Sequence, residues 1–441
     1  MPADTRGRRG HSTSSAEYKL LFTVTLALVA IGVVMVFSAS STTQILNDGG
    51  LAASTTFLKK TLIAVLIGFA LFALVTKMKL SRLREVTPKF AFACLGALVA
   101  VLVVGQEVNG TRGWFILGPA QIQPAEFLKL ALILYGAHLL ADQPERLRSI
   151  RDMGPYLGFT AISCFFVLMQ PDMGTAMIAI FAVGVTLVAA GAKRRDLTLL
   201  GGLVAAGAML FALAAPYRRD RLLTFLNPDA DIAGTGFQTI QAKIAIGSGG
   251  FGGVGIGNGV QKAFYLPEAH TDMISAVIGE EFGFLGLLIV IALFGMLGFA
   301  GFRIALNAKD SYGRILAGGL TGLILIQACL NLYAVMGMAP LTGVPLPLVS
   351  YGNNSLIVSL VAIGLILNVA RGGHAATVKR PVRDRRRESP AKLRVVQGER
   401  QKPPSRRTAT VAHRSTANSR DGRRRHSGTR GPGPGHRRRA S

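Results

Sequence analysis

Apolar runs long enough to cross a lipid bilayer recur along most of this chain and limit what it can fold into. A helix that spans the hydrocarbon core of a membrane needs roughly 20 predominantly apolar residues. Because lipid cannot pair with backbone polar groups, such runs must form helices. The sequence therefore predicts an all-α integral membrane protein with about ten transmembrane helices. The runs lie at residues 19–39, 58–76, 89–105, 124–141, 155–170, 173–191, 197–215, 272–302, 313–337 and 347–370.

The positive charge of the chain is concentrated at its C-terminal end. The net charge is +26, and residues 371–441 carry 22 Lys and Arg against 4 Asp and Glu. This segment is rich in Arg, Gly, Pro and Ser, so we predict a disordered basic tail. Contact with anionic lipid and contact with an acidic protein are the alternatives for its role. Nucleic acid is not an expected partner, because no aromatic stacking platform accompanies the arginines.

Lys and Arg residues alternate between the loops that connect the runs, and this bias predicts the orientation of the chain. Basic residues occur in the leader and in the connections at 77–89, 146–151, 193–195 and 303–314. The alternate short loops carry almost none. We therefore expect both termini in the cytoplasm, with a disordered leader at 1–17 and a membrane domain at 18–370. The segment 216–272 then forms a large extracellular loop between the seventh and eighth spans.

This extracellular loop ends on a carboxylate, Asp272, directly before the eighth apolar run. A carboxylate that is partly buried where a polar loop enters a helix can act as a general base or hold a divalent cation. The alternative is structural, because Asp is also favoured as an N-terminal helix cap. Glu268 and His270, in the same PEAHTD segment, are the other candidate bases.

Glycines and arginines are the other prominent residues of the extracellular side. Eight glycines fall between Gly247 and Gly259, without the context of a Walker or Rossmann motif. They allow a close-packed re-entrant path, an approach of backbone N–H groups to a phosphate, or simple flexibility. Arg112, Arg218 and Arg221 carry guanidinium groups that suit pyrophosphate or carboxylate. Anchoring to lipid headgroups is the alternative for these arginines.

Polar residues also interrupt three of the apolar runs. Glu126 and Lys129 lie three residues apart near the start of the fourth run. Charges inside a span are costly, so this pair is either functional or mutually neutralising. Glu280 and Glu281 lie one to two turns into the eighth run, where we expect at least one to face the bundle or a wet cavity. The motif PLPLVSYGNNS before the tenth run indicates a lined cavity or hydrogen bonding between helices.

Several of these motifs, in this order along residues 18–370, make the chain resemble the SEDS family of bacterial cell-wall proteins, which includes FtsW, RodA and SpoVE. The resemblance implies a ten-span peptidoglycan glycosyltransferase that polymerises lipid II outside the plasma membrane. It also implies a class B penicillin-binding transpeptidase as partner. The matching motifs are NGTRGWFILGPAQIQPAEFLKLAL, QPDMGTAMI, YRRDRLLTFLNP, GFQTIQAKIAIGSGG, GNGVQKAFYLPEAHTD, AVIGEEFGFLG and PLPLVSYGNNS.

By this resemblance Asp272 is the catalytic residue, as a base or a cation-assisted activator of the acceptor sugar hydroxyl. The leaving undecaprenyl pyrophosphate would be stabilised by Arg218, Arg221, Lys262 or a divalent cation, Mg or Mn, bound at Asp272. No organic cofactor is implied. The implied substrate-binding residues are Arg112, Trp114, Glu126, Lys129, Arg218, Arg221, Gln241, Lys262, Glu268, His270, Ser350 and Asn354.

The branch of the family is a separate question. The PEAHTD motif is more similar to the FtsW division branch, which implies a role at the division septum with other divisome proteins. The chain has YGNNS at 351–355, where the family usually shows YGGSS, so the branch and the details of the cavity stay open. The alternatives are a RodA-like elongation polymerase, a lipid II flippase and a non-catalytic scaffold. A flippase needs a polar path across the bilayer, whereas the polar residues here gather on one side.

Overall fold

The computed structural model describes residues 6–48, 55–108, 110–118, 120–142, 149–213 and 236–372, with the single residues 147, 219, 225 and 227. Arg218, Arg221 and residues 373–441 of the expected tail lie outside the described residues. All described residues belong to one compact unit within Met1–Val378.

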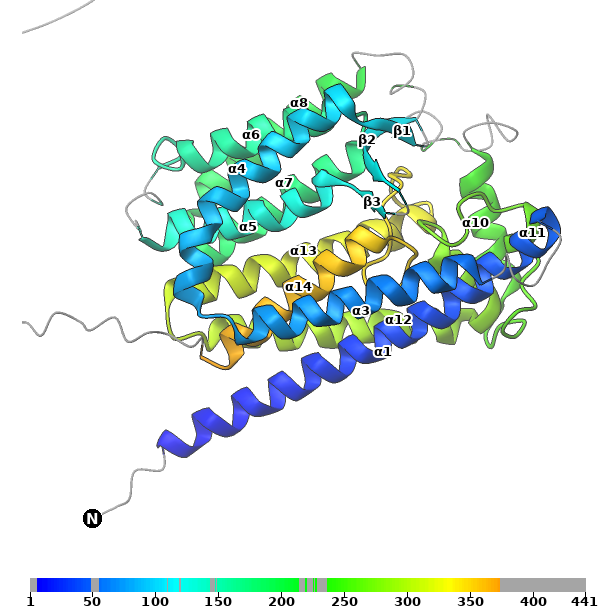
Figure 1. The fold of residues 1–441 in the computed structure, drawn as a ribbon, viewed down its shortest axis with the longest axis horizontal. Helices are drawn as coiled ribbons and strands as arrows, with labels where there is room; N and C mark the ends of the chain where they lie inside the picture. Colours follow the sequence, from blue (N-terminus) through cyan, green and yellow to red (C-terminus); the bar gives the residue numbers. More distant parts are fainter. Residues whose placement is uncertain are drawn as a thin grey trace, which may run out of the picture. The chain divides into compact units, whose positions relative to one another are not determined.

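Helices occupy all ten positions that the apolar runs predict (Figure 1). Eight of the helices in the described ranges are long and apolar enough to cross a membrane. The shorter α6 is also apolar, and α8 lies where the seventh run was expected. The multi-pass, mostly helical fold is therefore confirmed. The ten helices are α1 (Arg6–Asp48), α3 (Thr56–Lys77), α4 (Leu80–Val104), α5 (Pro124–Asp142), α6 (Gly154–Met169), α7 (Met173–Ala190), α8 (Arg194–Leu213), α12 (Ile274–Leu306), α13 (Ser311–Val335) and α14 (Asn353–Ala370).

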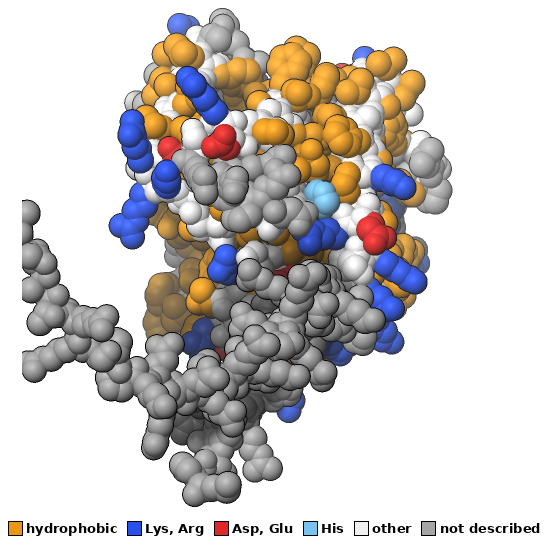
Figure 2. Space-filling view, turned by 90° about the vertical axis from the view of Figure 1, so that its left-hand side faces the viewer, with side chains coloured by type: hydrophobic (Ala, Val, Ile, Leu, Met, Phe, Trp, Pro, Cys, Tyr) orange, Lys and Arg blue, Asp and Glu red, His pale blue; other side chains and the backbone are white. Residues whose placement is uncertain are grey.

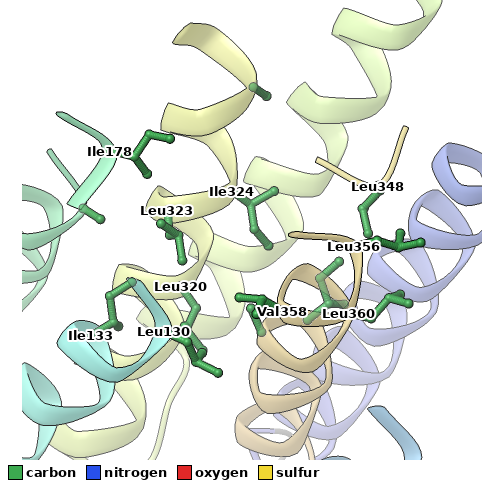
Figure 3. Packing of buried hydrophobic residues seen from close by; sticks show 14 of the residues in the cluster. Leu130, Ile133, Ile178, Leu320, Leu323, Ile324, Leu348, Leu356, Val358 and Leu360 are labelled. Carbon is green, nitrogen blue, oxygen red and sulfur yellow. The ribbon is translucent and has the colours of Figure 1, made fainter. Parts of the chain in front are cut away.

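Helices α13 and α14 form the centre of the bundle. Helix α13 packs against α5, α7, α12 and α14, and α14 packs against α3 on its other side. Figure 3 shows Leu320, Leu323 and Ile324 of α13 in the apolar layer between these helices. The outer helices α3 and α4 instead expose large apolar side chains such as Leu66 and Val103. Such a surface suits lipid as its solvent.

Glycines bring α13 close to its neighbours. A Cβ atom at Gly319 would lie 2.7 Å from both Ile133 Cγ2 of α5 and Thr186 Oγ1 of α7. A Cβ at Gly322 would collide with the Val185 side chain of α7. Small residues at helix contacts let backbones approach and increase dispersion contacts, which hold helices together in lipid.

Polar contacts place the start of α1 and the end of α14 at the same end of the bundle. Arg371, at the end of α14, donates a hydrogen bond of 2.8 Å to the hydroxyl of Tyr18. At this end Arg303 of α12 also pairs with Glu17 of α1, with 3.2 Å between Nε and Oε1. Figure 2 views this end and shows Lys and Arg side chains around its rim. Asp272 precedes α12, which runs antiparallel to α1, so Asp272 lies at the opposite end.

A small antiparallel sheet occupies the connection between α4 and α5, where only a loop was expected from the sequence. Its strands are β1 (Gln106–Val108), β2 (Thr111–Leu117) and β3 (Ala120–Ile122), in the order β1-β2-β3. Gly110 and Gly118 have positive φ values of 79° and 61° where the chain reverses between the strands. Two such tight reversals require residues that tolerate left-handed backbone, and glycine does so without a steric penalty.

The extracellular loop of the prediction is partly helical and closely packed on α12. It contains α10 (Phe237–Ser248) and α11 (Gln261–Phe264). Between them the glycine-rich segment joins α12 at a break, where Gly283 has φ 65° and ψ −160°. A Cβ at Gly253 would collide with the Glu281 carbonyl oxygen. Of the three interpretations of the glycines, the close-packed re-entrant path is the one that this packing supports.

We expect the contact at Gly319 to be sensitive to volume. Gly319→Leu forces α13 away from α5 and α7, and overpacking of this kind typically costs about 1–3 kcal/mol. The substitution should therefore lower the thermal unfolding midpoint of the detergent-solubilised protein. Gly295→Leu is the matched control, because a Cβ there meets no atom within 4 Å. Equal midpoints for the two variants would contradict this packing.

Candidate active site around Asp272

The PEAHTD segment folds into a turn directly before α12. The Thr271 N–H donates to the Glu268 carbonyl at 3.1 Å, and the Met273 N–H donates to the same oxygen at 3.3 Å. Glu268 itself has a positive φ of 55°. The Thr271 hydroxyl lies 2.8 Å from Glu268 Oε2 and 3.3 Å from Asp272 Oδ1. One hydroxyl therefore bridges the two carboxylates of the turn.

Asp272 does not cap the helix that follows. Met273 occupies the N-cap position of α12, and no side chain there makes a capping hydrogen bond. The structural alternative for Asp272 is therefore not supported. The carboxylate is half-buried and lies at a small pocket that it shares with Asn331 and residues 341–344.

The electrostatic environment of Asp272 suits proton transfer near neutral pH. Burial raises the pKa of its carboxyl group, the negative charge of Glu268 raises it further, and hydrogen bonds from the backbone and Thr271 offset part of the effect. The resulting pKa is about 7. A general base is most effective when its pKa lies near the working pH. Asp272 can therefore be ionised at neutral pH and still accept a proton.

His270 has a different environment from that of Asp272. Its ring lies 4.5 Å from the ring of Phe57 and 5.4 Å from that of Tyr351, measured between centroids. Burial lowers the pKa of the imidazole, so it is neutral at pH 7. Its carbonyl accepts a hydrogen bond of 2.9 Å from the Tyr351 N–H. The backbone of His270 thus joins the turn to the segment before α14, and the lowered pKa makes its imidazole a weaker base than an exposed histidine.

Asn331 of α13 fixes the Asp272 backbone, although it is not among the predicted site residues. Its amide nitrogen donates to the Asp272 carbonyl at 2.7 Å and to the Val344 carbonyl at 2.8 Å. Its amide oxygen accepts from the Ser275 hydroxyl at 3.0 Å. The amide is therefore saturated by protein groups in a buried position. An Asn four residues after Gln327 in an apolar run was the signal that could have revealed it.

Glu126 and Lys129 form the predicted pair, and a third residue extends it. Lys129 Nζ lies 2.8 Å from Glu126 Oε1 and donates at 3.1 Å to the Gln327 amide oxygen. Gln327 in turn donates to the Pro345 carbonyl at 3.0 Å and the Ser355 hydroxyl at 2.9 Å. The other carboxylate oxygen of Glu126, Oε2, is buried without a hydrogen-bond partner in the described part of the chain. That oxygen is therefore an unpaired buried acceptor, which is costly unless a donor reaches it.

Four other predicted residues contact protein groups. Arg112 of β2 is exposed and donates from Nε to the Gly105 carbonyl at 3.0 Å, which leaves its terminal nitrogens for other acceptors. The half-buried Trp114 lies beside β1. Ser350 accepts from the Leu346 N–H at 2.8 Å, and Asn354 donates to the Gln121 carbonyl at 2.9 Å. Ser350 therefore stabilises the segment before α14, and Asn354 joins the start of α14 to β3.

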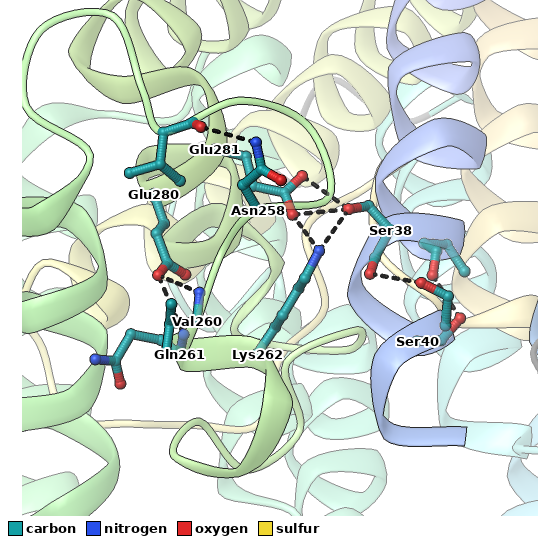
Figure 4. Close-up of polar contacts among 11 residues, drawn as sticks. Ser38, Ser40, Asn258, Val260, Gln261, Lys262, Glu280 and Glu281 are labelled. Atoms are coloured by element: carbon teal, nitrogen blue, oxygen red, sulfur yellow. Dashed lines mark hydrogen bonds and ion pairs between the residues drawn. The ribbon is translucent and has the colours of Figure 1, made fainter. Parts of the chain in front are cut away.

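Lys262 lies in a setting that argues against the expected contact with pyrophosphate. Its ammonium group is buried, forms an ion pair with Glu281 and donates to the Ser38 hydroxyl at 3.0 Å (Figure 4). The positive charge is thus neutralised within the protein. Glu280 accepts from the Val260 and Gln261 N–H groups, so both glutamates of α12 face protein rather than lipid. Gln241 is half-buried on α10.

A divalent cation at Asp272 stays a prediction. The described residues contain no cluster of three or more His, Cys, Asp or Glu side chains that could hold a metal. Asp272 and Glu268 supply two carboxylates in one turn, and Mg²⁺ often uses one or two carboxylates and keeps several waters. The donor set thus fits a partly hydrated cation and not a fully enclosed metal site.

Known proteins resemble this chain over most of its length. It is 41% identical over 365 residues to the probable peptidoglycan glycosyltransferase FtsW of Trichlorobacter lovleyi, which covers 81% of this chain and 94% of that protein. It is 38% identical over 355 residues to the stage V sporulation protein E of Bacillus subtilis, with coverage of 80% and 96%.

Solved structures share the fold as well. A chain from work on the structural coordination of polymerization and crosslinking by a peptidoglycan synthase complex has a TM-score of 0.65 at 34% identity, covering 80% of this chain and 97% of that one. The rod shape determining protein RodA of Thermus thermophilus has a TM-score of 0.59 at 31% identity, with the same coverage. A family model described as "cell cycle protein" for FtsW, RodA and SpoVE matches residues 18–374. The chain therefore belongs to the FtsW, RodA and SpoVE family.

Proposed function

We propose that the protein is a peptidoglycan glycosyltransferase that polymerises lipid II with Asp272 as its general base. The observation that carries the proposal is a half-buried carboxylate with a pKa of about 7, beside a pocket at one end of a membrane bundle. The relatives named peptidoglycan glycosyltransferases support this choice of reaction.

In the proposed reaction the ionised Asp272 accepts the proton of the acceptor sugar hydroxyl. The hydroxyl oxygen then forms a bond to the anomeric carbon of the growing strand. The bond between this carbon and the pyrophosphate oxygen breaks, and the electron pair leaves with undecaprenyl pyrophosphate. Arg112 has terminal guanidinium nitrogens without a hydrogen-bond partner among the described residues, and these could stabilise this negative charge. Arg218 and Arg221 remain candidates for the same role. A divalent cation held by Asp272 and Glu268 would supply further charge stabilisation when bound.

The polar residues at the ends of α5 and α13 support a substrate-binding role beside the base. Glu126 has one carboxylate oxygen committed to Lys129 and one without a partner among the residues described. An unpaired buried acceptor is costly unless a donor fills it. A sugar hydroxyl or amide of the substrate would satisfy this oxygen.

We further propose that the protein acts at the division septum with other divisome proteins and a class B penicillin-binding transpeptidase. The similarity to FtsW proteins and to a peptidoglycan synthase complex supports this assignment. The basic rim at the end where α1 begins supports placing that end in the cytoplasm, since Lys and Arg favour the cytoplasmic side. Asp272 would then face the extracellular side, where lipid II is polymerised.

Removal of the base should abolish polymerisation. Asp272→Asn keeps the shape of the side chain but not its basicity, and loss of a general base typically costs about 10²- to 10⁴-fold in rate. The assay is purified protein with lipid II, Mn²⁺ or Mg²⁺ and a cognate transpeptidase, with glycan ladders resolved on gels. Glu107→Gln on the exposed strand β1 is the control for loss of a carboxylate on the same side. Unchanged ladders in Asp272→Asn would refute the assignment of the base.

The pH dependence should follow the ionisation of Asp272. Because its raised pKa is about 7, the active carboxylate gains population as pH rises, and the rate should increase through this value. Glu268→Gln removes a negative charge that raises the pKa of Asp272, so the rising limb should move to lower pH. The rate of lipid II consumption between pH 5 and 9 tests both points. Glu107→Gln is the control and should leave the rising limb of the rate–pH profile in place. The same result for Glu268→Gln would contradict the electrostatic coupling between Glu268 and Asp272.

A further inference from the structure

Two polar contacts between α1 and α12 mark the boundaries of the hydrocarbon layer. Glu17 pairs with Arg303 at one end, and the Ser38 hydroxyl donates to Glu281 at 2.7 Å at the other. The helical path from Glu17 to Ser38 is roughly 32 Å at 1.5 Å per residue. The hydrocarbon core of a bilayer is about 30 Å thick. No charged residue occurs in α12 between Glu281 and Arg303, so the cluster at Ser38 lies at one membrane boundary.

The glycine-rich segment is attached to α12 at this boundary. The Val254 N–H donates to the Glu280 carbonyl at 3.0 Å, and the Phe284 N–H donates to the Gly250 carbonyl at 2.9 Å. The first contact, at Glu280, lies at the same height along α12 as the contact between Ser38 and Glu281. The second lies beyond Glu281, on the side of the apolar stretch of α12. Residues 250–255 are therefore held at the boundary and just inside it.

Apart from Asn258, the side chains of residues 250–260 are apolar, and they are exposed on the surface of the protein. No charged residue occurs between Lys243 and Lys262. The Phe251 ring stacks on that of Phe284 of α12, with 6.1 Å between centroids and an interplanar angle of 25°. This contact makes the surface continuous with the exposed apolar face of α12. The exposed fractions are 69% for Phe251, 41% for Val254, 58% for Ile256 and 62% for Val260.

We propose that residues 250–260 insert into the lipid leaflet on the Asp272 side as a shallow anchor. Apolar side chains at this depth are more stable among acyl chains than in water. The exposed glycine backbone needs water or headgroups as hydrogen-bond partners, which limits the depth of insertion. Because α11 and the PEAHTD turn follow directly, the anchor holds the turn at a fixed height above the leaflet. The inference does not depend on the proposed reaction.

Tryptophan fluorescence in vesicles of brominated phosphatidylcholine tests the insertion. Trp114 is the only tryptophan of the chain, so Trp114→Phe provides a silent background for Phe251→Trp and, separately, Ile256→Trp. We expect both reporters to be quenched more strongly by bromine near the headgroup end of the acyl chain than by bromine near its terminus. A reporter from Leu288→Trp, on the exposed face of α12 and further into the apolar stretch, should show the reverse preference.

A water-exposed reference comes from Gln121→Trp on β3. Its reporter should be quenched by iodide in the buffer and not by brominated lipid. If the Phe251→Trp and Ile256→Trp reporters behave like this reference, the proposal is overturned. It is also overturned if neither quencher reaches them, because the face is then covered by protein. Unfolding midpoints matched to the background protein show that each variant keeps the fold.

Discussion

Backbone N–H and C=O groups outside regular helices must form hydrogen bonds within the protein when they lie at a membrane, and this requirement shapes the Asp272 end of the bundle. Two side-chain amides of α13 supply several of these hydrogen bonds. Asn331 binds the carbonyls of Asp272 and Val344, and Gln327 binds the carbonyl of Pro345. The irregular segment before α14 and the turn before α12 are thus fixed to the same central helix. The geometry of the proposed base depends on these neutral amides as much as on any charge.

The helical architecture could be predicted from the sequence because lipid leaves few alternatives. The apolar runs placed all ten helices, and the Lys and Arg pattern agrees with the basic rim in Figure 2. The small sheet that contains Trp114 could not be predicted in this way, because β1 and β3 have three residues each and β2 does not alternate apolar and polar residues. The break of α12 at Gly283 was also hidden, since a single glycine in an apolar run does not reveal which segment fills the gap.

The site was predicted less evenly than the fold. The pairing of Glu126 with Lys129 is confirmed, because charged residues inside an apolar run must be paired or functional. The roles predicted for Asp272 and Glu268 stay predictions, and the structure places both residues in one turn. Asn331 and Gln327 were missed because several of their partners are backbone carbonyls, which sequence motifs do not display. The family resemblance led us to expect pyrophosphate binding by Lys262. Its neutralisation depends on Ser38, which lies far away in the chain.

The ion pair of Lys262 and Glu281 has a consequence for the variation of these two positions among related chains. Replacing one member leaves a buried charge without its counterion, which typically costs about 3–5 kcal/mol, whereas replacing both by apolar residues of similar volume is often neutral. The two positions should therefore change together or not at all. Ser38 should follow them, since its hydroxyl donates to the carboxylate and accepts from the ammonium group. The residues at these three positions, on three separate helices, should therefore be conserved together or replaced together in related chains.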